Sequence, residues 1–383
     1  MSKKYDYIIL GSGLSGLLTA YRMANDSWFD DKSIIIIDKE IKNQNDRTWC
    51  FWEEPNGEFD SILSNMWEKA FIGNHDFQQS FNLKPYQYKM IRSSAFYNLA
   101  VTKISSKANF TIINDEIISW KSETDSVEVQ GKNQLYVGNF LLNSFFDVNP
   151  VLNQKKYPYL KQHFIGWFIN SKRPIFDDSE VNFMDFTIEQ NGNTRFMYVL
   201  PTSKNDALFE YTLFSEDLLE KEEYENAIKD YLINLGITEY KITEKEEGNI
   251  PMTSYPFHNQ NSERVLFVGT AGGWTKASTG FTFFNSNKQS IKLVEFLKTN
   301  QKLSQFYQKN RYWFYDLILL EVLYQNNELG GDLFGRLFQK NSIQAIFQFL
   351  NEEGTFASDL KVMLTMPKWL FIKATFRAVW KLV

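Results

Sequence analysis

Short apolar runs separated by polar turns predict alternating strands and helices at the start of the chain. Residues 7–10 form a continuous apolar run, which is typical of a parallel strand buried on both faces. A glycine-rich turn follows, and the segment "GLLTAYRM" after it predicts a helix. A second apolar run, "SIIIID", predicts the next strand and ends at Asp38. The chain therefore opens with a β-α-β unit, which favours a parallel sheet.

Later segments alternate between apolar and polar positions, as expected for antiparallel strands. Residues 110–146 alternate and turn like a meander inserted into the first domain. Residues 182–215 predict three strands, divided at Asn191-Gly192 and at residues 203–206, and an Asn-Gly pair is a strong hairpin signal. The segment "EKEEYENAIKDYLINLG" predicts an amphipathic helix that ends at Gly236. From about residue 301 the pattern is helical, with few helix-breaking residues.

Composition and charge narrow the classes of protein to which the chain can belong. With 383 residues, 43% of them apolar and 23% charged, the chain has the profile of a globular protein of about two or three domains. A net charge of −5 argues against a general nucleic-acid binder, because no basic excess is available for phosphates. The single cysteine excludes an internal disulfide and a cysteine-based zinc cluster, and the three histidines lack metal-ligand spacing. We expect no metal site.

Aromatic residues make up 16% of the chain, which is a high share. Such residues fill a core, or they build long apolar tunnels and pockets that stabilise cations. The longest apolar stretches fall short of the roughly 18 residues of a transmembrane helix. The N-terminus leads directly into a predicted strand, so no signal peptide is expected.

The first turn carries a dinucleotide-binding fingerprint. Gly11, Gly13 and Gly16 form the pattern G-x-G-x-x-G between a strand and a helix. The first glycine allows the tight turn, the second lets a pyrophosphate approach, and the third lets the helix pack on the strand. Asp38 ends the second strand, about where an acid binds the adenosine ribose hydroxyls. We predict non-covalent dinucleotide binding through these four residues.

A second glycine-rich segment favours FAD as the dinucleotide. Residues 263–298 predict a strand, a glycine-rich turn and a helix from about Phe281. FAD enzymes of the glutathione-reductase and p-hydroxybenzoate-hydroxylase type end their nucleotide domain in a similar way, with a helix N-terminus near the flavin ring. Gly269, Thr270 and Gly280 are therefore expected to contact the flavin, although Gly269-Thr270 replaces the Gly-Asp pair of many such enzymes. Arg92, at the start of a predicted helix, resembles the flavin-contacting arginine of the same superfamily, with a surface arginine as the alternative.

These anchors predict an α/β fold with three parts. The first is a Rossmann-like FAD-binding domain made of residues 1–72, 90–148 and 262–300. The second is an antiparallel β-sheet domain for the substrate, made of residues 73–89 and 149–261. The third is a helical C-terminal region, residues 301–383.

An ordered series of motifs makes a family resemblance specific. The chain resembles the flavin-dependent lycopene β-cyclase family of bacterial type, and the series covers most of residues 5–300. Its members after the glycine fingerprint are "DRTWCFW" at 46–52, "QHFIGWFI" at 162–169, "VNFMDF" at 181–186, "RFMYVLPTSKNDALFEYTLFS" at 195–215, "EGNIPM" at 247–252 and "GTAGGWTKASTGFTF" at 269–283.

The resemblance implies a cyclisation of a carotenoid without net redox change. The family closes the ψ-ends of lycopene into β-ionone rings, giving γ-carotene and then β-carotene. A proton adds at C2 of the end group, the C5–C6 double bond attacks the cation at C1, and C6 loses a proton. Such chemistry requires a strong, positioned acid and a site that stabilises positive charge. The family uses reduced FAD, so NAD(P)H is implied as the reductant.

The segment 46–52 is expected to contribute to the substrate pocket. With the resemblance, Trp49, Phe51 and Trp52 are interpreted as the wall of an apolar pocket that offers π-faces to a carbocation. Asp46 and Arg47 are expected to fix this loop by an ion pair near the flavin. The alternative is that the three aromatics pack as core and the two charges only cap the loop.

Glu210 is the best candidate for the acid. On an alternating strand, Glu210 and Thr212 face one side while Phe209 and Tyr211 face the other. Apolar neighbours such as Leu208 would raise the pKa of the carboxyl group and keep it protonated. Asp185, in the motif "FMDF", is the second candidate, and for both a surface position is the alternative.

The C-terminal segment has the pattern of a membrane-surface helix. Lys373, Arg377 and Lys381 are spaced by four in "KWLFIKATFRAVWKLV", and bulky apolar residues form the other face, with tryptophan near both ends. This pattern is typical of an interfacial helix, and the alternative is a terminal helix that packs on the protein. A cytoplasmic protein peripherally associated with the inner membrane is expected, because lycopene dissolves in bilayers.

Three other functions fit the same flavin signals less specifically. They are a flavin monooxygenase or halogenase, a flavoprotein reductase of isoprenoid chains, and a non-enzymatic carrier of flavin or carotenoid. The product formed from lycopene separates them, because cyclisation alone leaves the mass unchanged.

Overall fold

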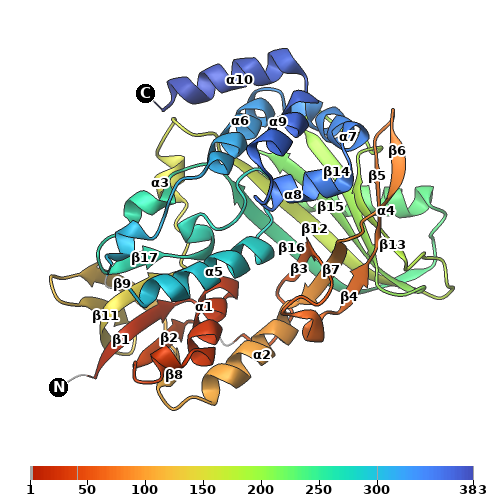
Figure 1. Cartoon of the computed structure of the whole chain (residues 1–383). Helices are drawn as coiled ribbons and strands as arrows, with labels where there is room; N and C mark the ends of the chain where they lie inside the picture. The colour runs from red at the N-terminus through yellow and green to blue at the C-terminus, as the bar shows by residue number, and fades with distance from the viewer. Residues whose placement is uncertain (1–2, 41, 300, 383) are drawn as a thin grey trace.

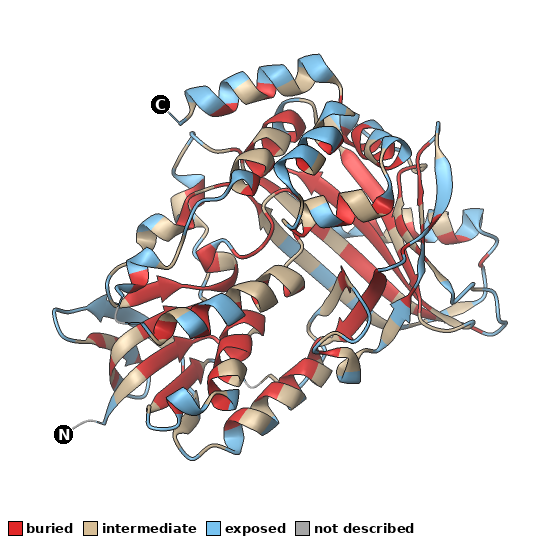
Figure 2. Cartoon of the chain, viewed as in Figure 1, coloured by how far each residue is buried: buried red, intermediate tan, exposed pale blue. Residues whose placement is uncertain are grey.

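The computed structural model describes residues 3–40, 42–299 and 301–382. Two seven-stranded sheets and a smaller three-stranded sheet form the framework (Figure 1). The C-terminal helices lie over the upper part of the second large sheet, opposite the N-terminal sheet in the view of Figure 1. Buried residues line the strands and the inner faces of the helices, whereas α10 is largely exposed (Figure 2).

The first sheet contains the predicted β-α-β unit. Its strand order is β8-β2-β1-β11-β10-β9, with β17 paired to β11, and the pairs β8–β2, β2–β1, β1–β11 and β11–β17 are parallel. The run Ile34–Ile37 is fully buried, which explains its uniformly apolar sequence. The strands are β1 Lys4–Leu10, β2 Ile34–Asp38, β8 Phe110–Asn114, β9 Ile117–Ser122, β10 Val127–Gly131, β11 Leu135–Asn143 and β17 Val265–Phe267.

Three helices accompany this sheet. Helix α1 (Leu14–Asn25) packs between α2 (Ser93–Ser105) and α5 (Phe283–Leu297), and the three share one apolar core. Helix α5 begins two residues after the expected Phe281. A short helix, α3 (Asn149–Leu152), follows the last strand of the meander.

The second sheet has the order β16-β12-β15-β14-β13-β5-β6 and is antiparallel except for the pair β5–β13. Helix α4 (Lys221–Asn234) covers its outer face and ends before Gly236, whose φ is 72°. The boundary expected after residue 72 falls inside β5, all of which pairs with β13. The strands are β5 Lys69–Gly73, β6 Gln78–Asn82, β12 Leu160–Ser171, β13 Glu180–Asp185, β14 Thr194–Pro201, β15 Asp206–Ser215 and β16 Tyr240–Met252.

The small sheet connects the two large ones. It has the order β3-β7-β4, with β3 Thr48–Glu53, β4 Asn65–Trp67 and β7 Gln87–Arg92. The motif at 46–52 therefore forms a strand rather than a loop over most of its length.

Five helices form the C-terminal region, as the pattern predicted. Helix α10 packs on α6 through Ala374 and Ala378, which allow a close approach. A search of the described residues finds none of these helices, nor any other, long and apolar enough to cross a membrane. The helices are α6 Arg311–Gln325, α7 Gly330–Lys340, α8 Ile343–Leu350, α9 Phe356–Leu364 and α10 Lys368–Trp380.

Candidate active site

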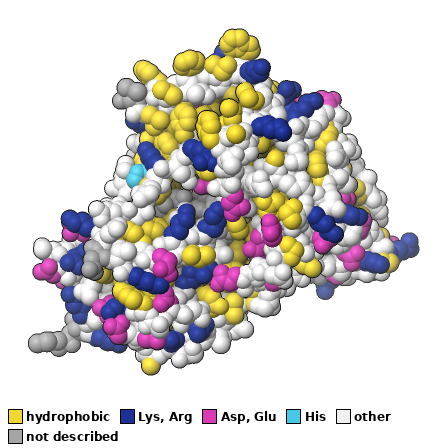
Figure 3. All heavy atoms as spheres, in the orientation of Figure 1, with side chains coloured by type: hydrophobic (Ala, Val, Ile, Leu, Met, Phe, Trp, Pro, Cys, Tyr) yellow, Lys and Arg dark blue, Asp and Glu magenta, His cyan; other side chains and the backbone are white. Residues whose placement is uncertain are grey.

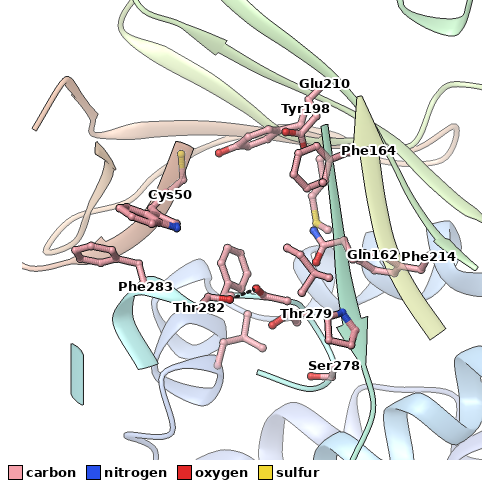
Figure 4. Close-up of a pocket in the computed structure, with 18 of the residues that line it drawn as sticks. Cys50, Gln162, Phe164, Tyr198, Glu210, Phe214, Ser278, Thr279, Thr282 and Phe283 are labelled. Atoms are coloured by element: carbon pink, nitrogen blue, oxygen red, sulfur yellow. Dashed lines mark hydrogen bonds between the residues drawn. The ribbon is translucent and has the colours of Figure 1, made fainter. Parts of the chain in front are cut away.

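A cavity of about 600 Å³ lies between the two large sheets and reaches the C-terminal helices. At one end it is lined by Gly13, Leu14 and Thr270 of the first domain, and at the other by Met363 and Phe371 of α9 and α10. Figure 4 shows its central part, with Cys50 on one side, Gln162 and Phe164 on the other, and residues 278–283 below. The volume is in the usual range for small-molecule sites.

The glycine fingerprint forms the end of the cavity nearest the first sheet. Gly11 has a φ of 92°, and a Cβ atom at Gly16 would lie 2.0 Å from the carbonyl oxygen of Gly11. Asp38 accepts hydrogen bonds from the backbone N–H and the hydroxyl of Ser12, at 2.6 and 2.8 Å. The carboxylate at the end of β2 therefore fixes the same turn that the glycines shape.

The start of α1 has the properties of an anion site. Gly13 is the N-cap residue, it makes no side-chain cap, and a Cβ atom built there meets nothing within 4 Å. The first amide groups of a helix carry partial positive charge and favour phosphate. The open space beside Gly13 thus fits a dinucleotide pyrophosphate in contact with the backbone.

The loop from 269 to 282 lines the cavity beside the fingerprint. Gly269 and Gly280 have positive φ values of 64° and 73°. The hydroxyl groups of Thr270, Thr275 and Thr282 are connected by two contacts of 3.1 Å, and Thr282 donates to the carbonyl of Gly280 at 2.9 Å (Figure 4). The buried hydroxyl of Thr279 has no partner among the described residues, so it is free for a bound ligand.

Arg92 lies outside the cavity lining. Its guanidinium group pairs with Glu244 and lies 4.3 Å from the ring centre of Phe168. The Arg92 side chain is thus held by Glu244 and Phe168, and its flavin contact stays a prediction.

The motif at 46–52 divides between the cavity and two apolar cores. Asp46, Arg47 and Trp49 line the cavity, and their contacts with a substrate stay predictions. Phe51 stacks on Phe283 at 4.6 Å in the core of the first domain. Trp52 stacks on Phe347 of α8 at 4.3 Å in the core of the second sheet, outside the cavity lining. Successive side chains of a strand point to opposite faces, which places Phe51 and Trp52 in different cores.

The partner of Asp46 differs from the expectation. Lys42 forms its ion pair at 3.2 Å, whereas Arg47 donates to the backbone oxygen of Asp46. Burial raises the pKa of Asp46, but hydrogen bonds from Tyr97, Lys42 and Ser93 more than offset this, and the pKa lies below its usual value. Asp46 is therefore an ionised, anchored group rather than a proton donor.

Glu210 lies on the wall of the cavity and is only 8% exposed. The alternation is as predicted, because Phe209 and Tyr211 pack under α4 while Glu210 faces the cavity (Figure 4). Burial, and then repulsion by Glu246, raise the pKa of Glu210 to about 8, although Thr212 donates a hydrogen bond of 2.7 Å to it. This carboxyl group is thus protonated at neutral pH.

Asp185 lies at the end of β13 and does not line the cavity. Its carboxylate accepts hydrogen bonds from the backbone and hydroxyl of Thr187, at 2.9 and 2.6 Å, and from the hydroxyl of Tyr231 at 2.7 Å. These contacts fix the turn after the strand and give Asp185 a structural position.

Several polar cavity residues escaped the sequence analysis. The hydroxyl groups of Tyr88 and Tyr198 are 2.6 Å apart, and burial raises the pKa of the neighbouring Cys50 to about 12. Glu246 also lines the cavity and accepts a hydrogen bond of 2.7 Å from Thr48. Glu246 lies in the charged run "EKEEG", which is typical of a solvent-exposed strand. Only the pairing of this strand with its neighbour shows that Glu246 lies beside the cavity.

The fold and the cavity define a class of architecture, in which a sheet with a glycine-rich dinucleotide-binding turn lies beside a second, largely antiparallel sheet. Solved structures at 10–13% identity share this fold, which confirms the predicted α/β architecture. They include the flavin-dependent brominase Bmp2 (TM-score 0.63, 11% identity, 94% of this chain and 98% of that one), the halogenase PltM in complex with phloroglucinol and FAD (0.60, 13%, 94% and 85%) and a geranylgeranyl bacteriochlorophyll reductase-like protein from Thermoplasma acidophilum (0.59, 10%, 98% and 96%).

Within this class the chain belongs to the lycopene cyclase family. The family model described as lycopene cyclase protein matches residues 6–376, nearly the whole chain. A lycopene beta-cyclase of Pantoea ananas is 24% identical over 263 residues. That alignment covers 66% of this chain and 64% of the relative, so it spans less than two thirds of the relative's length. The predicted family is confirmed.

Proposed function

We propose that this protein is a lycopene β-cyclase, an isomerase of carotenoid biosynthesis that forms β-ionone rings from the ψ-ends of lycopene. The observation that carries the proposal is Glu210, a buried carboxyl group with a raised pKa on the wall of a predominantly apolar cavity. Membership of the lycopene cyclase family supports a carotenoid as the substrate. γ-Carotene and then β-carotene would be the products.

The side chains of the cavity suit an acid-initiated ring closure. The Glu210 proton would add to C2 of the end group, and the C5–C6 double bond would then attack the cation at C1. The rings of Trp49, Phe183 and Phe281 line the same cavity and offer π-faces to positive charge. The apolar wall excludes water, which would otherwise capture the cation as an alcohol.

The first domain fits FAD as the cofactor. The open approach to Gly13 suits the pyrophosphate, Asp38 lies at the end of β2, and Thr270 and Thr279 lie beside the cavity. Bound reduced FAD, maintained by NAD(P)H, would supply negative charge near the developing cation without transferring a hydride.

We further propose that the protein works at the surface of the inner membrane, on its cytoplasmic side. Helices α9 and α10 form part of the cavity wall through Met363 and Phe371 and present apolar side chains to the outside. Figure 3 shows these hydrophobic side chains around the C-terminal helices, with Lys and Arg among them. A substrate dissolved in a bilayer would then meet the protein at the helices that enclose its cavity.

Product analysis tests the proposed activity. The protein would be incubated without oxygen with lycopene in liposomes, FAD and NADPH, and the wild type is expected to give ring-closed carotenoids of unchanged mass. Replacement Glu210→Gln is expected to lower turnover by about 10²–10⁴-fold, because it removes the acidic proton while preserving the shape of the side chain. Flavin binding would persist, since the glycine turn lies on the other sheet.

Asp185→Asn is the matched comparison, since Asp185 lies on the same sheet outside the cavity. It should keep the cyclisation rate of the folded protein. A product with added oxygen would indicate a monooxygenase, and one with added hydrogen an isoprenoid reductase. Wild-type activity of Glu210→Gln would overturn the assignment of the acid.

A further inference from the structure

Two carboxyl groups and a glycine lie in one row across the second sheet. In β12, Gly166 is directly opposite Glu210 of β15 on one side and Glu246 of β16 on the other. Residues directly opposite each other in a sheet point to the same face. Glu210 and Glu246 therefore extend from the two strands that flank β12 and face the same cavity.

The missing side chain at Gly166 lets the two carboxyl groups approach each other. A Cβ atom at Gly166 would lie 3.2 Å from Cγ of Glu246 and 3.6 Å from Cβ of Glu210. The Cδ1 atom of Leu208 would lie 2.9 Å away, so Leu208 and the two glutamates border the space above the glycine. A larger residue at this position would separate the two glutamates.

The surroundings of the two groups assign the proton to Glu210. Glu210 faces Thr212, Tyr198 and the carboxylate of Glu246, and no described cation pairs with it. Burial raises the pKa of Glu246 above its usual value, and a hydrogen bond from Thr48 and the nearby charges of Arg92 and Arg47 offset part of this effect. Nearby positive charge favours the ionised form. Because these cations lie near Glu246 and no described cation is near Glu210, Glu246 is the member of the pair that ionises more readily.

We propose that Glu246 is the base that completes the ring closure, which rests on the proposed cyclase function. Glu210 gives its proton to C2, and the new C1–C6 bond leaves positive charge at C5. The electron pair of the C6–H bond then forms the C5=C6 double bond, and the proton passes to Glu246. Transfer of this proton across Gly166 to Glu210 restores both groups, so no proton is gained or lost in a turnover.

The position of the base decides which ring is formed. A cation at C5 has three kinds of neighbouring hydrogen, at C6, at C4 and on the methyl group. Loss from C6 gives the β-ring, loss from C4 gives the ε-ring, and loss from the methyl group gives a ring with an exocyclic double bond. A single carboxylate held beside Glu210 by the strand register selects one of these hydrogens.

The ratio of ring isomers tests this role separately from activity. Glu246→Gln is expected to reduce turnover at least tenfold, and the rings that still form should include isomers with the double bond elsewhere. Glu246→Asp should recover the β-ring as the main product, because it restores a carboxylate. Glu244→Gln is the matched control, since Glu244 lies two residues away on the same strand outside the cavity lining, and should give only β-rings.

A pH profile provides a second readout. Wild-type turnover should fall at low pH, where Glu246 is protonated, and at high pH, where Glu210 is ionised. Glu246→Gln should lose only the low-pH decline. The inference is wrong if the wild type forms rings and the variant Glu246→Gln keeps the wild-type rate, isomer ratio and low-pH decline. The proposed cyclase function would then still stand. If the wild type forms no rings, the proposed function itself fails.

Discussion

The raised pKa of Glu210 depends on the lack of a cationic partner for its carboxyl group. Its hydrogen-bond donor in the described structure is the neutral hydroxyl of Thr212, and its nearest charged neighbour is another carboxylate. Burial without a cation disfavours the ionised form of a carboxyl group. The folded protein therefore holds a proton on Glu210 that the unfolded chain would release in mildly acidic solution.

This difference predicts how stability changes with pH. The pKa of Glu210 is about 8 when folded and has the ordinary value of 4.5 when unfolded. Between these values the unfolded chain binds fewer protons, so rising pH destabilises the folded protein by up to about 1.4 kcal/mol for each pH unit. The variant Glu210→Gln should not show this decrease in stability with rising pH. Urea titrations should therefore show that its free energy of unfolding, relative to that of the wild type, rises from pH 5 to pH 8. Parallel curves would contradict the raised pKa.

For individual residues, the sequence predicted chemical roles better than the direction in which each side chain points. Gly11, Gly13 and Gly16 were recognisable because their spacing follows from backbone geometry alone. Phe51 and Trp52 were placed in the pocket, yet they pack in cores, because aromatic character does not say which face of a strand is covered. Glu246 was missed because its importance depends on its partners across β12, which are remote in sequence.

The outer face of helix α10 has no partner in the described chain. Its large apolar side chains are exposed, with Trp369 at 78%, Phe376 at 72% and Trp380 at 84%. Lys373 and Arg377 flank this stripe, and no described carboxylate forms an ion pair with either. Exposed tryptophans beside unpaired basic residues are typical of a helix that lies at a membrane surface. Helix α10 packs on α6 through its inner face, as the alternative expected, and only its outer face is left for contact with a membrane.

We therefore predict that α10 binds bilayers. The triple variant Trp369→Ser, Phe376→Ser, Trp380→Ser should pellet less with anionic liposomes than the wild type, because it loses apolar contact with the lipid. Pelleting of the wild type should also weaken with salt, since each basic residue near an anionic surface contributes about 1 kcal/mol.

The control is a double variant, Ile233→Ser, Leu235→Ser, at the exposed end of α4, whose residues are 60% and 54% exposed. It should pellet like the wild type. Both variants should keep the wild-type melting temperature, because the replaced side chains contribute little to the core. Equal pelleting of the triple variant and the wild type would exclude α10 as the membrane contact.

At the element scale, local patterns predicted strands and helices but not all of their pairings. The hairpin at Asn191-Gly192 follows from the φ values of 42° and 80° that this pair tolerates. The parallel pair β5–β13 joins segments more than a hundred residues apart, and no local pattern specifies such a pairing. The boundary near residue 72 was misplaced for this reason.

On the scale of the whole molecule, the cavity lies where the two large sheets and the C-terminal helices meet. A cofactor bound at Gly13 would contact the folded chain only, since the glycine turn forms no site when unfolded. Ligands that bind only the folded state stabilise it, by about 2.7 kcal/mol at a hundred times the Kd. Flavin binding should therefore be visible in the unfolding of the entire protein.

We predict that added FAD raises the melting temperature of the cofactor-free wild type and that Gly13→Ala abolishes this rise. The alanine methyl group would occupy the space where the pyrophosphate approaches. The variant without FAD should melt like the wild type without FAD, because a Cβ atom at Gly13 meets no atom within 4 Å and its φ of −75° suits any residue. Calorimetry measures both effects, and an undiminished rise in Gly13→Ala would refute the cofactor assignment.

The path of the chain around the cavity has a consequence for its synthesis. The glycine turn and the strands of the second sheet are synthesised before the helices from α6 to α10, which complete the cavity wall. Until they emerge, the apolar face of the second sheet has no cover. Exposed apolar surface on an incomplete chain promotes aggregation. Synthesis of helices α6 to α10 is thus expected to cover this apolar face and to complete the cavity wall at the same stage.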